Sequence, residues 1–265
     1  MSRIPSLLAA LVTIALPPPI SDDLCTRPVA CPEWLGPVLE RVVPPIADVD
    51  VPADLLDLGD WYLTLPTGEE DDPKDVYPPD LGTFEGNWFR LNDAADGVVF
   101  RANAGGVTTE NSDYPRSELR EMIDGDLASW SNESGTHTLE VRQAVTRLPE
   151  VKPHVVTAQI HGGDDDVVLV RLEGEELKAE YDDGDSEIVI DPAYELGTPY
   201  DLRITAADSR IEIFYNGELA AEIPRSGSGW YFKTGAYVQS NPEKGDDPDA
   251  VAEVVIYSLQ VEHSE

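Results

Sequence analysis

Three short segments of this 265-residue chain carry side chains that could bind an anion and move protons beside it. Neighbouring side chains of a β-strand point to opposite faces, so every second residue shares a surface. On that rule each segment has one face of arginine, lysine, glutamine, histidine or tyrosine and a mostly apolar reverse face. The polar faces carry Arg116, Glu118 and Arg120, then Gln159 and His161, then Tyr231, Lys233, Tyr237 and Gln239.

If the three segments lie in one sheet, these faces combine into a groove. Its positive groups would bind a carboxylate, and His161 and Tyr237 would be available for proton transfer. For any single segment, an ordinary solvated sheet face with Arg–Glu pairs is the simpler interpretation. Three such segments in a chain with only four histidines and five lysines favour a functional groove instead.

The elements that must position these residues are short strands separated by turn clusters. Asn216-Gly217 between two alternating segments is a strong hairpin signal, and no amphipathic helix of useful length is present. This pattern predicts an all-β fold, an antiparallel two-sheet β-sandwich of the jelly-roll kind. The predicted strands are residues 61–65, 98–101, 117–121, 136–145, 155–161, 167–172, 177–181, 187–190, 200–206, 210–215, 218–223, 231–239 and 251–261.

The N-terminal part differs in composition from the rest. Arg3 precedes a short apolar stretch, so residues 1–20 are typical of a secretory signal, and we expect a secreted protein. Residues 21–54 are rich in proline and acidic residues and read as an extension before a folded domain at 55–265. Cys25 and Cys31 in the extension would close a small disulfide loop or remain free thiols.

The charge limits the choice of partners. With 18 basic and 52 acidic residues, the net charge is 18 − 52 = −34, which argues against a nucleic-acid partner. Such a surface fits a protein kept soluble in concentrated salt, or simply an acidic secreted protein. An anionic substrate would be repelled unless basic groups gather in one groove. After the signal segment no stretch could cross a membrane, and we expect a monomer without a membrane partner.

At the three segments the sequence resembles the alginate lyases of polysaccharide lyase family 7, the alginate lyase 2 type. Their signature blocks are Arg-(Ser/Thr)-Glu-Leu-Arg, Gln-(Ile/Val)-His and Tyr-Phe-Lys-Ala-Gly-x-Tyr-x-Gln. Here the blocks stand in the same order at 116–120, 159–161 and 231–239. The resemblance covers roughly residues 55 to 263. Thr234 replaces the usual Ala and Val238 a frequent Asn, both on the predicted reverse face of the strand.

The resemblance implies a jelly roll with a concave substrate cleft that cleaves alginate, an anionic polysaccharide, by β-elimination without an organic cofactor. We predict no metal ligands among the site residues. Ile160 in the second block is associated in the family with guluronate-containing substrate. By this resemblance, Arg116 and Gln159 neutralise the substrate carboxylate, and Tyr237 is the acid/base, with His161 assisting or serving as base. Neighbouring sugars would be held by Arg120, Lys233 and Gln239. Glu118 would orient the arginines, and Tyr231 would contact sugar or pack.

Other interpretations remain at this point. A lyase for another polyuronate, such as glucuronan, would use the same residues. A retaining glycoside hydrolase needs two carboxylates about 5 Å apart, and the strand that would supply them is not found. A non-catalytic carbohydrate-binding β-sandwich has no use for His161 and Tyr237 on an arginine-lined face. The acidic runs at 69–72, 164–166 and 246–247 offer oxygen ligands for Ca²⁺, but their spacing favours solvated loops.

Overall fold

The structure, a computed structural model, describes residues 49–163 and 165–264. The predicted signal segment, most of the extension and both cysteines lie outside these residues. The described chain forms two antiparallel sheets, and its only helices are three short 3₁₀ turns. They are η1 (Pro52–Asp54), η2 (Asp80–Thr83) and η3 (Pro242–Lys244). No helix within the described ranges is long and apolar enough to span a membrane.

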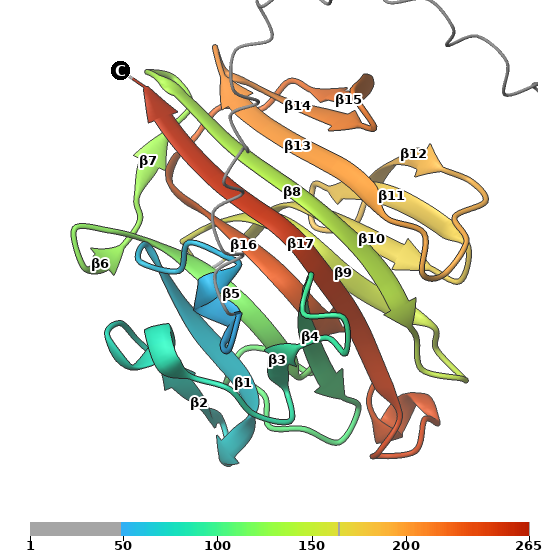
Figure 1. The fold of residues 1–265 in the computed structure, drawn as a ribbon. Helices are drawn as coiled ribbons and strands as arrows, with labels where there is room; N and C mark the ends of the chain where they lie inside the picture. The colour runs from blue at the N-terminus through green and yellow to red at the C-terminus, as the bar shows by residue number, and fades with distance from the viewer. Residues whose placement is uncertain (1–48, 164, 265) are drawn as a thin grey trace, which may run out of the picture. The chain divides into compact units, whose positions relative to one another are not determined.

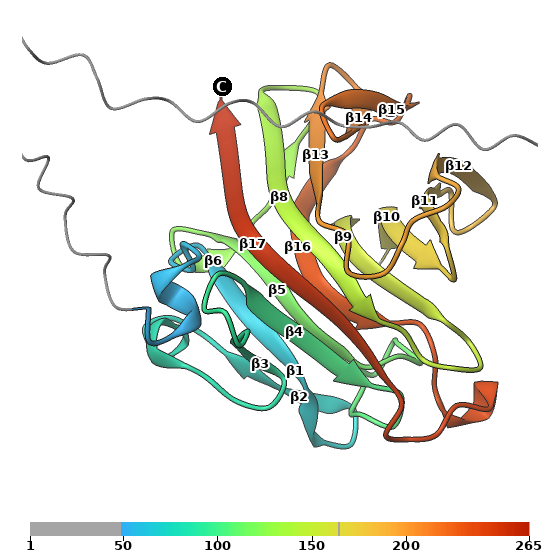
Figure 2. The same cartoon turned by 45° about the vertical axis from the view of Figure 1, so that its right-hand side comes forward.

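The first sheet has the strand order β12-β11-β10-β9-β16-β5-β1-β2, with β6 beside β5 and β7 beside β16. Figure 2 shows this sheet curving, with β10, β11 and β12 at one side and β1 and β2 at the other. Its strands are β12 (Ser186–Asp191), β11 (Glu176–Tyr181), β10 (Asp165–Glu173), β9 (His154–Gly162), β16 (Ser228–Val238), β5 (Arg116–Ile123), β1 (Trp61–Glu69), β2 (Asp72–Val76), β6 (Asp126–Leu127) and β7 (Trp130–Ser131).

The second sheet has the order β15-β14-β13-β8-β17-β4-β3 and covers one face of the first (Figure 1). Large apolar side chains such as Phe100 and Phe232 fill the space between the sheets and are fully buried. The strands are β15 (Glu218–Ile223), β14 (Arg210–Tyr215), β13 (Tyr200–Ala207), β8 (Thr136–Arg147), β17 (Val251–Ser264), β4 (Val98–Asn103) and β3 (Phe89–Leu91).

The predicted sandwich and all thirteen predicted strands are confirmed. Alternation explains why they could be found: in β13 the residues Tyr200, Leu202, Ile204 and Ala206 are buried, and those between them are not. The Asn216-Gly217 turn joins β14 to β15, and both residues have positive φ (51° and 86°), as a two-residue hairpin requires.

Four short strands escaped prediction. β2 consists mostly of exposed polar residues, β3 has three residues, and β6 and β7 have two each. Each lies at the margin of a sheet or beside one longer strand, so backbone pairing rather than an apolar pattern defines it.

β16 lies between β5 and β9 in the first sheet, which is the arrangement the site requires. Its register with β9 shifts between Thr234 and Tyr237, where Gly235 has φ 143°. A Cβ on Gly235 would lie 2.5 Å from the carbonyl oxygen of Ser117, so only glycine fits. Beside this irregularity Thr234 donates a hydrogen bond from its hydroxyl to the carbonyl of Thr157, at 3.0 Å. The threonine that departs from the family pattern therefore holds the backbone where the register changes.

A buried carboxylate ties β5 to its neighbours on the core side. Glu121 is fully buried and accepts hydrogen bonds from the Trp130 indole (3.0 Å), the Phe232 backbone amide (2.7 Å) and His263 Nε2 (2.5 Å). The Nδ1 atoms of His263 and His137 lie 2.7 Å apart, and the His137 ring stacks on Trp130. We call Glu121, Trp130, His137 and His263 the Glu121 cluster. It joins β5 and β7 of the first sheet to β8 and β17 of the second.

Candidate active site

The structure brings the predicted site residues onto three adjacent strands. In the β5–β16 ladder Arg120 is opposite Lys233 and Arg116 is opposite Tyr237. On the other side of β16, Gln159 is opposite Lys233 and His161 is opposite Tyr231. Gln239 follows the last residue of β16.

The intervening residues point into the core, as alternation predicted. Ile160, Phe232, Thr234 and Val238 are fully buried. Tyr237 instead packs with Val156 and Leu169 in a small cluster separate from the main core. The two departures from the family pattern, Thr234 and Val238, thus lie on the reverse face.

Glu118 is the carboxylate at the centre of the site. It is fully buried, its Oε2 lies 3.3 Å from Arg116 Nη1, and its Oε1 accepts a hydrogen bond from Gln159 Nε2. Glu118 and Arg116 lie on β5, whereas Gln159 lies on β9, so this one carboxylate holds an arginine of its own strand and a glutamine reached across β16. This is the orienting contact that the sequence assigned to Glu118, although with one arginine and one glutamine rather than two arginines.

Tyr237 is held against Arg116. The guanidinium carbon lies 3.8 Å from the centre of the phenol ring, a cation–π contact. The phenol oxygen lies 3.0 Å from Ser112 Oγ, which also accepts a hydrogen bond from Arg116 Nη2 at 2.9 Å. Tyr237, Ser112 and Arg116 therefore form one connected group.

His161 stands at the other end of the site, beside Tyr231, with 5.2 Å between the ring centres. Burial, and then the charges of Lys233, Arg120 and Arg116, lower its pKa to about 3. At neutral pH the imidazole is therefore uncharged and has a free lone pair to accept a proton.

Lys233 and Arg120 supply the remaining basic groups. Lys233 is 1% exposed, and burial lowers its pKa well below the ordinary value, with Glu118 opposing that shift and both arginines adding to it. Arg120 donates a hydrogen bond to the Tyr62 hydroxyl at 3.4 Å. Tyr231 is buried 5.5 Å below Lys233 Nζ, and burial raises its pKa to about 12. Of the two roles considered for Tyr231, sugar contact and packing, this burial favours packing.

Half of the buried side-chain polar atoms without a protein partner gather in this site. Within the described residues there are ten such atoms. Buried polar atoms are normally paired, so a concentration of unpaired ones points to a polar ligand. The five in the site are Arg116 Nε, Arg120 Nε, Gln159 Oε1, His161 Nδ1 and Gln239 Nε2, a mixture of donors and acceptors that suits sugar hydroxyls and carboxylates.

A cavity of about 370 Å³ continues the site toward β10 and β11. Tyr237 and Gln239 line its near side, and Arg171 and Glu180 line its far side. The last two already form an ion pair with each other. The cavity thus offers a polar path beside Tyr237.

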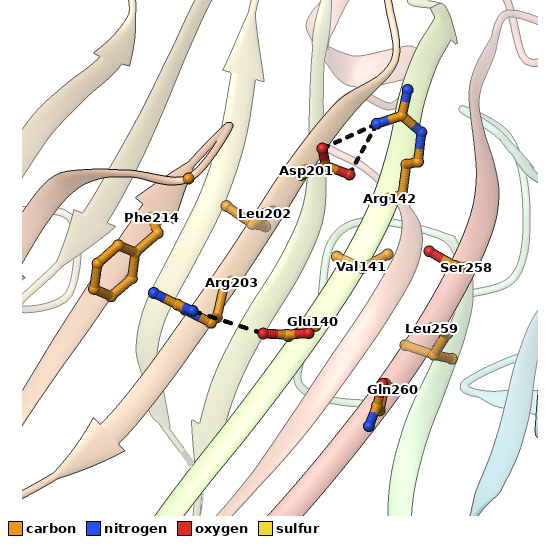
Figure 3. A pocket seen from close by; sticks show the side chains of 11 residues that line it. Glu140, Val141, Arg142, Asp201, Leu202, Arg203, Phe214, Ser258, Leu259 and Gln260 are labelled. Carbon is orange, nitrogen blue, oxygen red and sulfur yellow. Dashed lines mark hydrogen bonds and ion pairs between the residues drawn. The ribbon is translucent and has the colours of Figure 1, made fainter.

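Another hollow lies on the outward face of the second sheet, over β8, β13, β14 and β17 (Figure 3). Its charged groups satisfy one another: Arg142 lies 2.9 Å from Asp201, and Arg203 lies 3.8 Å from Glu140. It contains none of the predicted site residues, and we assign it no role in the chemistry.

Sequence reasoning missed Ser112 and Tyr62. Tyr62 was within reach, because alternation in the segment 61–65 places it opposite Arg120 in the β1–β5 ladder. Ser112 lies in a loop before β5, where no periodic pattern applies.

Metal ligation has no geometric support in residues 49–163 and 165–264, where no three His, Cys, Asp or Glu side chains are grouped to hold an ion. One predicted acidic-run residue, Asp246, instead accepts from the Val151 amide and the Ser240 hydroxyl.

A β-sandwich with an Arg–Gln–His–Tyr group on the open face of one sheet defines a polysaccharide lyase. The sequence model of the alginate lyase family matches residues 56–263, and this chain belongs to that family.

Solved structures agree with this assignment. Alginate lyase AlgAT5 from polysaccharide lyase family 7 is 49% identical, with a TM-score of 0.79 over 82% of this chain and 100% of that one. An alginate lyase from Corynebacterium sp. is 46% identical, with a TM-score of 0.78 over 81% and 99% of the two chains. A curated alginate lyase of Klebsiella pneumoniae is 38% identical over 86 residues, 31% of this chain and 28% of that protein.

Proposed function

We propose that this chain depolymerises alginate by β-elimination and acts on guluronate-containing blocks. The observation that carries the proposal is the group formed by Arg116, Glu118, Gln159 and Tyr237 on one sheet face, in which Arg116 Nε and Gln159 Oε1 are buried without a hydrogen-bond partner. Elimination next to a carboxylate needs this combination of charge neutralisation and proton transfer.

In the proposed reaction the C5–H bond breaks and its proton passes to a base, the C4–C5 double bond forms, and the C4–O bond breaks. Negative charge builds on the C5 carboxylate, where Arg116 and Gln159 would stabilise it. Tyr237 would protonate the departing oxygen. A bound carboxylate raises the pKa of a nearby imidazole, so substrate binding itself would make His161 a better base than it is in the free enzyme.

The support for guluronate is a single position. Ile160 stands in the position that the family associates with this sugar. Because Ile160 is fully buried in the core, it would act through the neighbouring side chains of Gln159 and His161 and not by contact. A relative 28% identical, the family 7 alginate lyase A1-II', has been solved in complex with a product written GGG.

The test is absorbance near 235 nm, where the unsaturated product absorbs, on guluronate-rich alginate, mannuronate-rich alginate and glucuronan. We expect the fastest rise on guluronate-containing polymer. Much faster cleavage of pure polymannuronate, or cleavage of glucuronan alone, would contradict the proposal.

The catalytic assignment is tested by Tyr237→Phe, which keeps the ring over Arg116 and removes only the hydroxyl. General acid–base catalysis contributes roughly 10²- to 10⁴-fold, so kcat should fall by at least that lower factor. Unfolding by urea should remain near that of the wild type. A variant with wild-type kcat would remove Tyr237 from the mechanism.

We further propose that the chain is exported and acts as a monomer. The support is the sequence of residues 1–20 and the acidic surface of the sandwich. Light scattering of the purified chain and the N-terminal sequence of exported protein would test both points.

A further inference from the structure

The Ser112 hydroxyl has more polar atoms within hydrogen-bond distance than it can bond at one time. Its Oγ lies 2.9 Å from Arg116 Nη2 and 3.2 Å from the Tyr114 amide nitrogen. It also lies 3.0 Å from the Tyr237 phenol oxygen and 3.2 Å from the Tyr114 carbonyl oxygen. These four atoms surround a group that has one proton and two lone pairs.

Counting protons shows that Ser112 cannot accept a hydrogen bond from Tyr237. The guanidinium of Arg116 and the amide of Tyr114 can only donate, so together they occupy both lone pairs of Ser112. No lone pair is left to accept the phenol proton. The Ser112 proton must therefore serve either Tyr237 or the Tyr114 carbonyl, and only the first choice makes the 3.0 Å contact to Tyr237 a hydrogen bond.

We propose that Ser112 is a positioning residue that donates a hydrogen bond to the Tyr237 oxygen and leaves the phenol proton facing the cleft. This inference rests on the proposed function, because it assumes that Tyr237 is the acid. Within the described residues the Tyr237 hydroxyl has no other hydrogen bond, and Tyr237 is one of the residues that line the 370 Å³ cavity.

The arrangement favours the transition state over the ground state. As Tyr237 gives its proton to the departing oxygen, its own oxygen becomes negative, and a hydrogen bond to an ionised acceptor is about twice as strong as one between neutral groups. The Ser112 hydroxyl, itself held by Arg116, is already in place before this charge develops. Interactions that strengthen only in the transition state raise kcat rather than lower KM.

The experiment compares Ser112→Ala and Ser112→Thr with the wild type by steady-state kinetics on guluronate-rich alginate. We expect Ser112→Ala to lower kcat by roughly tenfold to a hundredfold, the size of one hydrogen bond to a charged group, with KM nearly unchanged. Ser112→Thr keeps the hydroxyl and should recover most of the loss. The matched control is Ser131→Ala on β7. It removes a serine hydroxyl that donates a hydrogen bond to the Gly227 carbonyl, and it should leave kcat unchanged.

A double variant separates a positioning role from a general structural one. In the Tyr237→Phe background there is no phenol oxygen to receive the hydrogen bond, so adding Ser112→Ala should cost little more. Fully additive losses would overturn the inference, as would wild-type kcat in Ser112→Ala or no recovery in Ser112→Thr. A wild-type chain that forms no unsaturated product would instead refute the proposed function. An active wild type with unaltered Ser112→Ala kinetics would refute only the role of Ser112.

Discussion

Replacing Glu121 by Ala should be among the most destabilising single changes in this chain. The carboxylate is fully buried and is the common acceptor for the Trp130 indole, the Phe232 amide and His263. Alanine would leave the first two donors without a partner in the core. His263, whose side chain is 27% exposed, could still reach water.

The size of the loss follows from the two buried donors. A hydrogen bond to a charged group is worth about 1.5–3 kcal/mol, so losing two should lower the free energy of unfolding by about 3–6 kcal/mol. Glu121→Gln should cost far less. Its amide oxygen can accept from Trp130 and Phe232, and its amide nitrogen can donate to His263 Nε2 if that ring carries its proton on Nδ1, facing His137.

The measurement is urea unfolding of the full chain at fixed pH and salt, followed by the fluorescence of tryptophan. With an m value of about 3 kcal/mol per M, Glu121→Ala should lower the midpoint by about 1 to 2 M. Glu212→Ala, which removes a partly exposed carboxylate beside Arg210, is the control and should change stability by no more than about 0.5 kcal/mol. If Gln proved as costly as Ala, the hydrogen-bond count would be wrong and the charge itself would hold the cluster.

Three further predictions concern pH, backbone geometry and salt. The pKa of His161 is about 3 in the folded chain and ordinarily 6.5, so between these pH values the unfolded chain binds a proton that the folded chain does not. The free energy of unfolding should therefore fall as the pH drops from 6.5 toward 3, and His161→Gln should reduce that fall in urea titrations. Gly235→Ala places a Cβ 2.5 Å from the Ser117 carbonyl oxygen at a residue with φ 143°, so it should lower the free energy of unfolding by at least about 1–3 kcal/mol and remove most of the lyase activity. Gly82→Ala, with open space around the new Cβ, should change neither. A net charge of −34 should make both stability and initial rate rise from low to moderate NaCl; a steady loss of both with salt would contradict this.

The sandwich was predictable because one face of most strands must meet the other sheet. β13 shows regular alternation of buried and less buried residues. In β5, β9 and β16 the site residues likewise alternate with residues that point into the core. Alternation was enough to assign Arg116, Gln159, His161 and Lys233 each to the polar face of its own strand.

What alternation could not supply is the order of the strands and the contacts between side chains. β5, β9 and β16 are far apart in sequence, and their adjacency comes from long-range pairing. The register shift at Gly235 and its brace from Thr234 depend on a local irregularity that a strict two-residue period does not contain. Ser112 belongs to a loop, and its role follows only from four measured distances.

The place of β16 between β5 and β9 has a consequence for how the enzyme binds its substrate. Ladders on both sides fix the backbone of a central strand, and hydrogen bonds within the site hold the side chains of Arg116, Gln159 and Tyr237. The conformational entropy of aligning these side chains is therefore lost during folding and not during binding. Such preorganisation leaves more of the contact energy of each sugar available for affinity and catalysis. The flexible polysaccharide, rather than the protein, would then bear most of the ordering cost when the two meet.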